Sequence, residues 1–158
     1  MTLTCAIIDD EPLAISLLES YVNKTPFLRL TAKFNSALEA LPVLSAQPVE
    51  LLFLDIQMPG FDGFSVVSGL AEVEPPLFVF VTAYSDHALK GFEAGAVDYL
   101  MKPVDTDRLA DTMERVRQRL AEKRAAEEVV QLKEVIAEHA PEAHEALPDS
   151  AEQPASSR

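Results

Sequence analysis

Short apolar runs alternate with longer amphipathic segments through the first two-thirds of the chain. The runs are rich in Val, Ile, Leu and Phe, and they occupy residues 3–8, 28–34, 51–54, 77–81 and 97–101. Most are apolar at consecutive positions, which is typical of strands that helices cover on both faces. The intervening segments predict helices over residues 12–23, 36–45, 63–70 and 86–93, and a fifth helix begins near Thr106.

Local signals support two of these helix starts. Pro12 stands early in the first helix, where its missing N–H costs nothing. Ser36 followed by Glu39 forms a capping box for the second helix. Five repeats of strand then helix predict a parallel five-stranded sheet with right-handed crossovers. We therefore expect the α/β class, as a flavodoxin-like (βα)5 three-layer sandwich with strand order 2-1-3-4-5.

The character of the chain changes after the fifth strand. Residues 107–140 contain neither Gly nor Pro, and apolar residues recur at helical spacing as Leu109, Met113, Val116 and Leu120, then as Val129, Leu132 and Ile136. The nine-residue gap between the two sets breaks a strict heptad, so a dimerising coiled coil and a solvated linker helix both remain open. We expect a domain over 1–120, an extended C-terminal helix as linker or coiled coil over 121–140, and a disordered tail over 141–158.

Composition narrows the class of protein. No run of about 20 apolar residues is available to cross a bilayer, and the first residues lack the basic region of a signal peptide. The single cysteine, Cys5, lies in an apolar run and reads as a buried strand residue. The net charge of −13 comes without a basic stripe. We expect a cytoplasmic protein with no membrane partner and no nucleic acid bound by this chain itself.

Chemically active side chains stand where the predicted strands end. They are Asp9, Asp10 and Glu11 after the first strand, Asp55 after the third, Thr82 after the fourth and Lys102 after the fifth. Ligands of such sheets sit beyond the carboxyl ends of the strands, so these groups are expected in one crevice. Crowded carboxylates suit Mg2+, while a lysine and a threonine hydroxyl can hold phosphate oxygens.

Each of these residues also has a simpler explanation. Asp10 alone could cap the first helix, Lys102 alone could be a surface charge, and Thr82 alone could be an ordinary strand residue. The convergence of the whole set at one edge of the sheet favours a functional site.

Four segments resemble the signatures of response-regulator receiver domains, in order and with that family's spacing. They are residues 7–12 (IIDDEP), 53–63 (FLDIQMPGFDG), 81–83 (VTA) and 98–103 (DYLMKP). The resemblance spans about residues 3–120. The stretch from 82 to 103 further resembles the LytTR-type (LytR/AlgR) subfamily.

The resemblance implies a phosphoacceptor site with bound Mg2+. Asp55 is implied to be the nucleophile that takes a phosphoryl group from a sensor histidine kinase. Asp10 is implied to bind Mg2+ directly and Asp9 through water, and the backbone carbonyl of Gln57 supplies another ligand. The protein would then be no enzyme, beyond catalysing its own phosphorylation and dephosphorylation.

The resemblance also implies a switch. Thr82 and Lys102 would contact the phosphoryl oxygens, and Tyr99 would turn inward as Thr82 moves towards the phosphate. The peptide bond before Pro103 is expected to be cis. The rim of the pocket would be formed by Glu11, Gln57 and Tyr84.

The implied output is less determined. Phosphorylation would switch the face built from the fourth helix, fifth strand and fifth helix. LytTR-type regulators usually carry a C-terminal DNA-binding domain, which residues 1–158 do not include. Two readings follow: a piece of a longer transcription regulator, or a stand-alone receiver that acts through protein contacts. A homodimer through the linker helix or the switch face is expected.

Two other classes are weaker. A haloacid-dehalogenase-like phosphatase also uses a strand-end Asp with Mg2+, but it needs a second Asp where this chain has Gln57. A flavodoxin-like binding module leaves the acids and Lys102 unexplained. One reading of Phe61 leaves it exposed beside Asp55, where it could help kinase docking. The histidines are read as surface residues rather than zinc ligands, and they are His87, His139 and His144.

Overall fold

The computed structural model describes residues 2–71 and 75–139. Contacts divide the chain into two units, Met1–Arg119 and Leu120–Arg158. Among the described helices, none combines the length and the apolar composition needed to cross a membrane.

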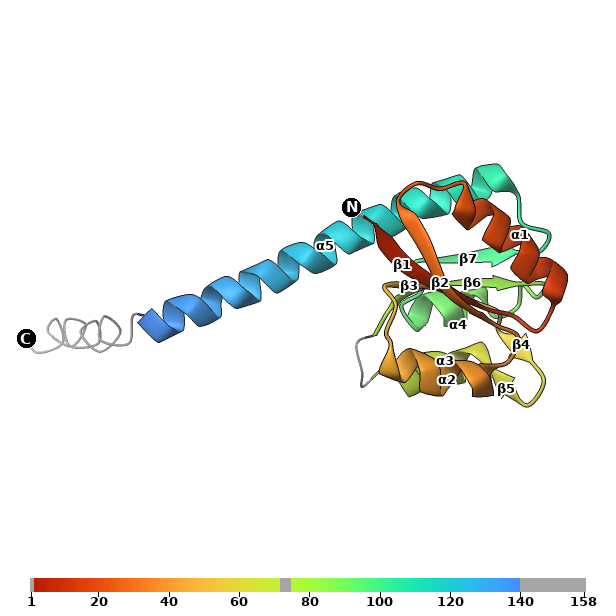
Figure 1. Ribbon diagram of the computed structural model, residues 1–158, viewed down its shortest axis with the longest axis horizontal. Coiled ribbons are helices and arrows are strands. Elements are labelled where there is room, and N and C mark those ends of the chain that lie inside the picture. Colours follow the sequence, from red (N-terminus) through yellow and green to blue (C-terminus); the bar gives the residue numbers. More distant parts are fainter. Residues whose placement is uncertain (1, 72–74, 140–158) are drawn as a thin grey trace, which may run out of the picture. The chain divides into compact units, whose positions relative to one another are not determined.

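The first unit is built on a sheet of five parallel strands. In chain order they are β1 (Leu3–Ile8), β2 (Leu28–Phe34), β3 (Leu51–Leu54), β6 (Leu77–Thr82) and β7 (Asp98–Met101). Their spatial order is β2-β1-β3-β6-β7 (Figure 1). Counting only the strands of this sheet, that is 2-1-3-4-5, so the predicted order is confirmed.

Helices cover both faces of the sheet. They are α1 (Pro12–Asn23), α2 (Ala37–Ala46), α3 (Gly63–Leu70), α4 (Ala88–Glu93) and α5 (Thr106–His139). Figure 1 shows α1 and the first turns of α5 over one face, with α2, α3 and α4 over the other. The predicted three-layer sandwich is therefore confirmed.

Burial follows this layering. Ile8, Leu54 and Phe80 lie in register on adjacent strands, are fully buried, and share a core cluster with Leu44 of α2 and Val66 of α3. Because the strands are in register up to their last residues, the loops that follow β1 and β3 begin side by side. The candidate functional site lies where these two loops begin.

Several boundaries differ slightly from the expected ones. Ser36 accepts a hydrogen bond from the Glu39 amide (3.4 Å), so α2 begins one residue later than predicted. The helix α4 begins at Ala88, two residues later than predicted. The sequence patterns also missed an antiparallel hairpin directly after the third strand, formed by β4 (Gln57–Met58) and β5 (Phe61–Asp62).

The second unit contains the continuation of α5 from Leu120 to His139. No residue of this segment is buried. The predicted tail at 141–158 lies outside the described residues.

Candidate functional site

Three carboxylates meet at the carboxyl end of the sheet. Asp9 directly follows β1 and Asp55 directly follows β3, and the Asp55 amide donates to the Ile8 carbonyl (3.0 Å). One carboxylate oxygen from each of Asp9, Asp10 and Asp55 lies within 4.8 Å of the other two. Asp9 and Asp55 are buried, whereas Asp10 is exposed. The convergence that the parallel sheet predicted is therefore present.

Asp10 does not cap the first helix. The residue at the N-cap of α1 is Glu11, and its side chain makes no capping hydrogen bond. The Glu11 amide instead donates to Asp9 Oδ1 (2.9 Å). The capping alternative for Asp10 is thus wrong, and its carboxylate is left facing the cluster.

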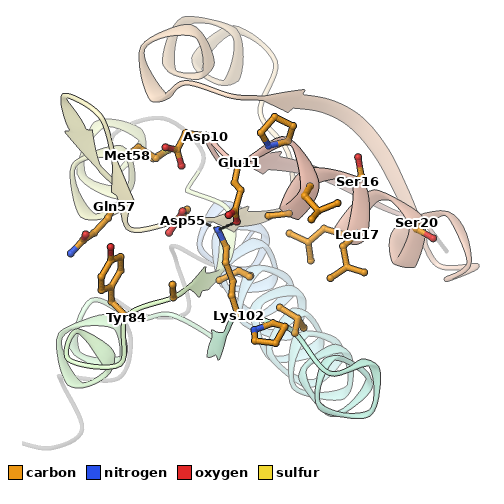
Figure 2. Close-up of a pocket in the computed structure, with 18 of the residues that line it drawn as sticks. Asp10, Glu11, Ser16, Leu17, Ser20, Asp55, Gln57, Met58, Tyr84 and Lys102 are labelled. Atoms are coloured by element: carbon orange, nitrogen blue, oxygen red, sulfur yellow. Dashed lines mark hydrogen bonds and ion pairs between the residues drawn. The ribbon is translucent and has the colours of Figure 1, made fainter.

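Lys102 joins the acids from the other side of the site. Its Nζ lies 2.9 Å from Asp9 Oδ2, 3.1 Å from Glu11 Oε1 and 3.2 Å from Asp55 Oδ2. The Lys102 amide donates to the Thr82 carbonyl (2.8 Å), and the Lys102–Pro103 peptide bond is cis. Figure 2 shows the lysine reaching between Asp55 and Glu11.

Burial and charge shift the pKa values of this cluster. Burial raises the pKa of Asp9 to about 6, although hydrogen bonds from Lys102 and from the Glu11 amide oppose the shift. Burial by itself would lower the pKa of Lys102, but the carboxylates of Asp9, Glu11 and Asp55 outweigh it and raise the pKa. The amine is therefore a permanent cation among acids that repel one another.

The donor set fits a hard divalent cation. Asp55 Oδ1 is buried and has no hydrogen-bond partner among the described residues. A buried carboxylate oxygen without a partner is costly, and a bound cation would satisfy it. Three converging carboxylates and no histidine or cysteine form the oxygen-only ligand set that Mg2+ prefers.

The threonine and tyrosines form a hydrogen-bonded group beside this cluster. Thr82 is fully buried at the end of β6, and its Oγ1 accepts a hydrogen bond from the Tyr84 amide (3.4 Å). Tyr99 is buried, and its hydroxyl donates to the Tyr84 carbonyl. Burial raises the pKa of Tyr99. Tyr84 thus links Thr82 to Tyr99 through its backbone.

The acidic cluster opens into a cavity of about 1200 Å³. Glu11, Gln57 and Tyr84 line it as predicted for the rim, and Figure 2 shows Gln57 and Tyr84 beside Asp55. Along α1 its wall contains the exposed side chains of Leu13 (79%) and Leu17 (48%), together with Ser16 and Ser20.

Phe61 does not line the cavity beside Asp55, so the docking reading of this residue gains no support. It is half-buried in the β4–β5 hairpin and lines a second cavity, of about 710 Å³, together with His87 and Lys90. His87 is half-exposed, and its Nε2 lies 3.4 Å from the side-chain Nε2 of Gln57, whereas His139 is exposed. His144 lies outside the described residues.

Sequence patterns missed the role of Gly63. A Cβ atom on this residue would lie 2.5 Å from the Asp55 carbonyl oxygen, so the site needs a glycine directly behind Asp55. The signal in the sequence was the glycine itself, which we interpreted only as a helix start.

Comparison with known proteins supports one family. A family model described as the response regulator receiver domain matches residues 5–114. An uncharacterized response regulatory protein of Shewanella oneidensis is 39% identical over 118 residues, 75% of this chain and 50% of that protein. The transcriptional regulatory protein BtsR of Escherichia coli K12 is 38% identical over 112 residues, 71% of this chain and 47% of BtsR. The chain thus spans about half the length of these curated relatives.

Solved structures agree. The response regulatory domain of mrkE from Klebsiella pneumoniae has a TM-score of 0.70 and 28% identity, over 76% of this chain and 99% of that one. The REC domain of AraT, a response regulator from Geobacillus stearothermophilus, has a TM-score of 0.70 and 26% identity, over 78% and 99%. The chain therefore belongs to the response regulator receiver domains, the signalling domains of two-component systems.

Proposed function

We propose that Asp55 accepts a phosphoryl group from a sensor histidine kinase, with Mg2+ held at the acidic cluster. The observation that carries this proposal is the environment of the Asp55 carboxylate. One of its oxygens is paired with Lys102, and the other is buried without a partner next to Asp9 and Asp10. Such a carboxylate can be esterified while its neighbours remain ionised.

In the proposed transfer, an Asp55 carboxylate oxygen forms a bond to phosphorus as the bond from phosphorus to the donor's nitrogen or oxygen breaks. Phosphoryl transfer depends mainly on positioning and on neutralising charge. The carboxylates of Asp9, Asp10 and Asp55 and the backbone carbonyl of Gln57 would hold Mg2+. When bound, Mg2+ offsets the repulsion between the anionic acceptor and the anionic donor. Lys102 supplies a fixed positive charge for a phosphoryl oxygen.

Two features of the surroundings support the signalling part of the proposal. The exposed leucines of α1, Leu13 and Leu17, offer a partner protein apolar docking surface next to Asp55. Hydrogen bonds to the backbone of Tyr84 connect Thr82, at the site, with Tyr99 of β7. We propose that phosphorylation moves Thr82 and Tyr99 and so alters the face made by α4, β7 and α5.

The decisive experiment is intact-mass measurement after incubation with acetyl phosphate and Mg2+. We expect one added phosphoryl group on the wild type and none on Asp55→Asn. Asp62→Asn is the matched control, because Asp62 caps α3 through the Ser65 amide (2.9 Å) and asparagine caps equally well. It should be phosphorylated like the wild type. Equal mass gain in the wild type and Asp55→Asn would contradict the proposal.

The output we propose is transcription regulation in the cytoplasm, with a LytTR-type DNA-binding domain in the same polypeptide. The support is the resemblance over residues 82–103 and the similarity to the transcriptional regulatory protein BtsR, of which the chain spans 47%. The alternative is a stand-alone receiver that works through protein contacts. The open reading frame beyond Arg158 distinguishes the two.

Turnover of a phosphomonoester would instead favour the phosphatase alternative, although Gln57 takes the place of its second aspartate.

A further inference from the structure

The second unit exposes an apolar stripe. Val129, Leu132, Val135 and Ile136 are each between 50% and 60% exposed. Their spacings of three, three and one place them along one side of α5. Contiguous apolar surface on a single helix indicates a partner that covers it.

We propose that a second copy of this chain covers the stripe, as a parallel two-stranded coiled coil whose seam runs from Ala125 to Ile136. In this register Val129 and Ile136 occupy a positions, and Ala125 and Leu132 occupy d positions. Branched residues at a with leucine at d favour two parallel strands over other arrangements. The inference does not depend on phosphorylation. Of the two expected dimer interfaces, it places the contact on the linker helix rather than on the switch face.

Charge supports the parallel orientation. Glu128 occupies a g position and Lys133 the following e position. In a parallel pair, g of one helix faces the next e of the other, so Glu128 would face Lys133 of the partner subunit. In an antiparallel pair, like charges would face each other. Among residues 2–71 and 75–139, neither side chain has an ion-pair partner within its own chain, so both are available.

The same register limits the length of the seam. Glu122 would occupy the preceding a position, where two glutamates would face each other in the pair. The seam therefore cannot extend toward the N-terminus beyond Ala125, and it covers about two heptads. Such a short seam predicts a reversible dimer whose population depends on protein concentration.

Cysteine cross-linking tests orientation and register together. In a parallel seam, Ala125→Cys and Ile136→Cys each meet their own copy, and both should form disulfide dimers under mild oxidation. An antiparallel pair allows at most one of the two. Val130→Cys is the control, because Val130 is equally exposed (54%) but occupies a b position off the seam. The native Cys5 is fully buried and should not react.

Sedimentation equilibrium of the full chain gives an independent measurement. We expect Leu132→Arg to raise the dimer Kd at least about tenfold, whereas Val130→Arg leaves it unchanged. Glu128→Lys should weaken the dimer, and adding Lys133→Glu to the same chain should restore it. The proposal is overturned if Val130→Cys cross-links as fast as the seam cysteines, or if only one seam position cross-links. It is equally overturned if Leu132→Arg dimerises like the wild type or the chain stays monomeric at millimolar concentration.

Discussion

At the scale of single residues, the position of Asp55 depends on Gly63, which packs directly behind it. The Gly63 amide donates to the Ile56 carbonyl (2.7 Å), which draws the start of α3 against the loop that carries Asp55. The approach is so close that a methyl group would overlap the Asp55 carbonyl oxygen and press on the Phe80 ring, 3.2 Å away.

We expect Gly63→Ala to lower the free energy of unfolding by about 3 kcal/mol, because the backbone on both sides must move. Urea unfolding measures the loss, and phosphorylation by acetyl phosphate should fall with it. Gly69→Ala is the matched control within the same helix. Its added methyl meets only the flexible end of Leu41 at 3.1 Å, and alanine favours the helix, so the change should stay within about 1 kcal/mol. A Gly63 variant as stable as the Gly69 variant would contradict this account.

The acidic cluster makes a second prediction at this scale. Magnesium should raise the thermal midpoint of the wild type, and a concentration of 100 times the Kd stabilises by about 2.7 kcal/mol. Asp10→Asn should show a smaller rise, because one ligand is lost. The exposed control Asp86→Asn should respond as the wild type does. The same shift in all three proteins would argue against a metal site at Asp10.

The positions of Asp9, Asp55 and Lys102 could be predicted because one rule, that parallel strands end at the same edge, applies wherever strands alternate with helices. The contact between Gly63 and Asp55 could not be predicted. It depends on how a particular loop and helix pack, and no periodicity of the sequence records that. The position of Phe61 in the β4–β5 hairpin could not be predicted for the same reason.

At the scale of elements, a buried ion pair fastens the first turns of α5 to β7. Asp98 is fully buried, and it accepts from Arg108 at 2.6 and 2.7 Å and from the Thr112 hydroxyl at 2.7 Å. Arg115 lies 3.1 Å from the same carboxylate. Burial alone would raise the pKa of Asp98, but the hydrogen bonds from Arg108, Thr112 and the Tyr99 amide outweigh it and lower the pKa.

This ion pair should make the free energy of unfolding depend on pH in the acidic range. Because the folded pKa of Asp98 lies below its ordinary value of 3.8, the stabilisation is fully present above that value. It is lost as the pH falls through the lower folded pKa. We expect Asp98→Asn to be about 2 kcal/mol less stable than the wild type at pH 6, with the difference shrinking below about pH 4.

Urea unfolding of both proteins across that pH range measures the difference directly. The control is Glu93→Gln, an exposed acid on α4, which should change stability by less than about 0.5 kcal/mol at pH 6. A difference between wild type and Asp98→Asn that grew on acidification would show that the sign is wrong.

Long or strongly patterned elements were the predictable ones. The apolar runs of the central sheet and the apolar periodicity of α1 were enough to locate these elements. The strands β1, β2 and β3 have the expected bounds, whereas β6 ends one residue later and β7 begins one residue later than predicted. The hairpin of β4 and β5 has two residues in each strand, too few for any period to appear. Its turn contains Gly60 at φ +76°, a conformation that the sequence indicated only by the glycine.

At the scale of the whole molecule, Cys5 reports global unfolding. It is fully buried in β1, between β2 and β3, and burial raises the pKa of its thiol to about 12. Near pH 8 the Cys5 thiol is therefore inaccessible to an alkylating reagent and almost entirely protonated. We expect alkylation to require opening of the sheet, so its rate should depend on urea as steeply as global unfolding does.

Ser45→Cys provides the exposed reference, because position 45 lies on the solvent side of α2. It should react at once and independently of urea. Labelling of Cys5 with a shallow dependence on urea would mean that the sheet opens locally.

The strand β2 has one further consequence for association. It is an outer strand of the sheet, and along it exposed and half-buried residues alternate, with Arg29 and Lys33 among the exposed. Lys33 also pairs with Glu19 of α1 at 2.8 Å. Charged side chains, lysine above all, discourage a sheet margin from recruiting another strand. Aggregation by edge-to-edge addition along β2 is thereby disfavoured, which leaves the concentrated protein free to pair through its helices.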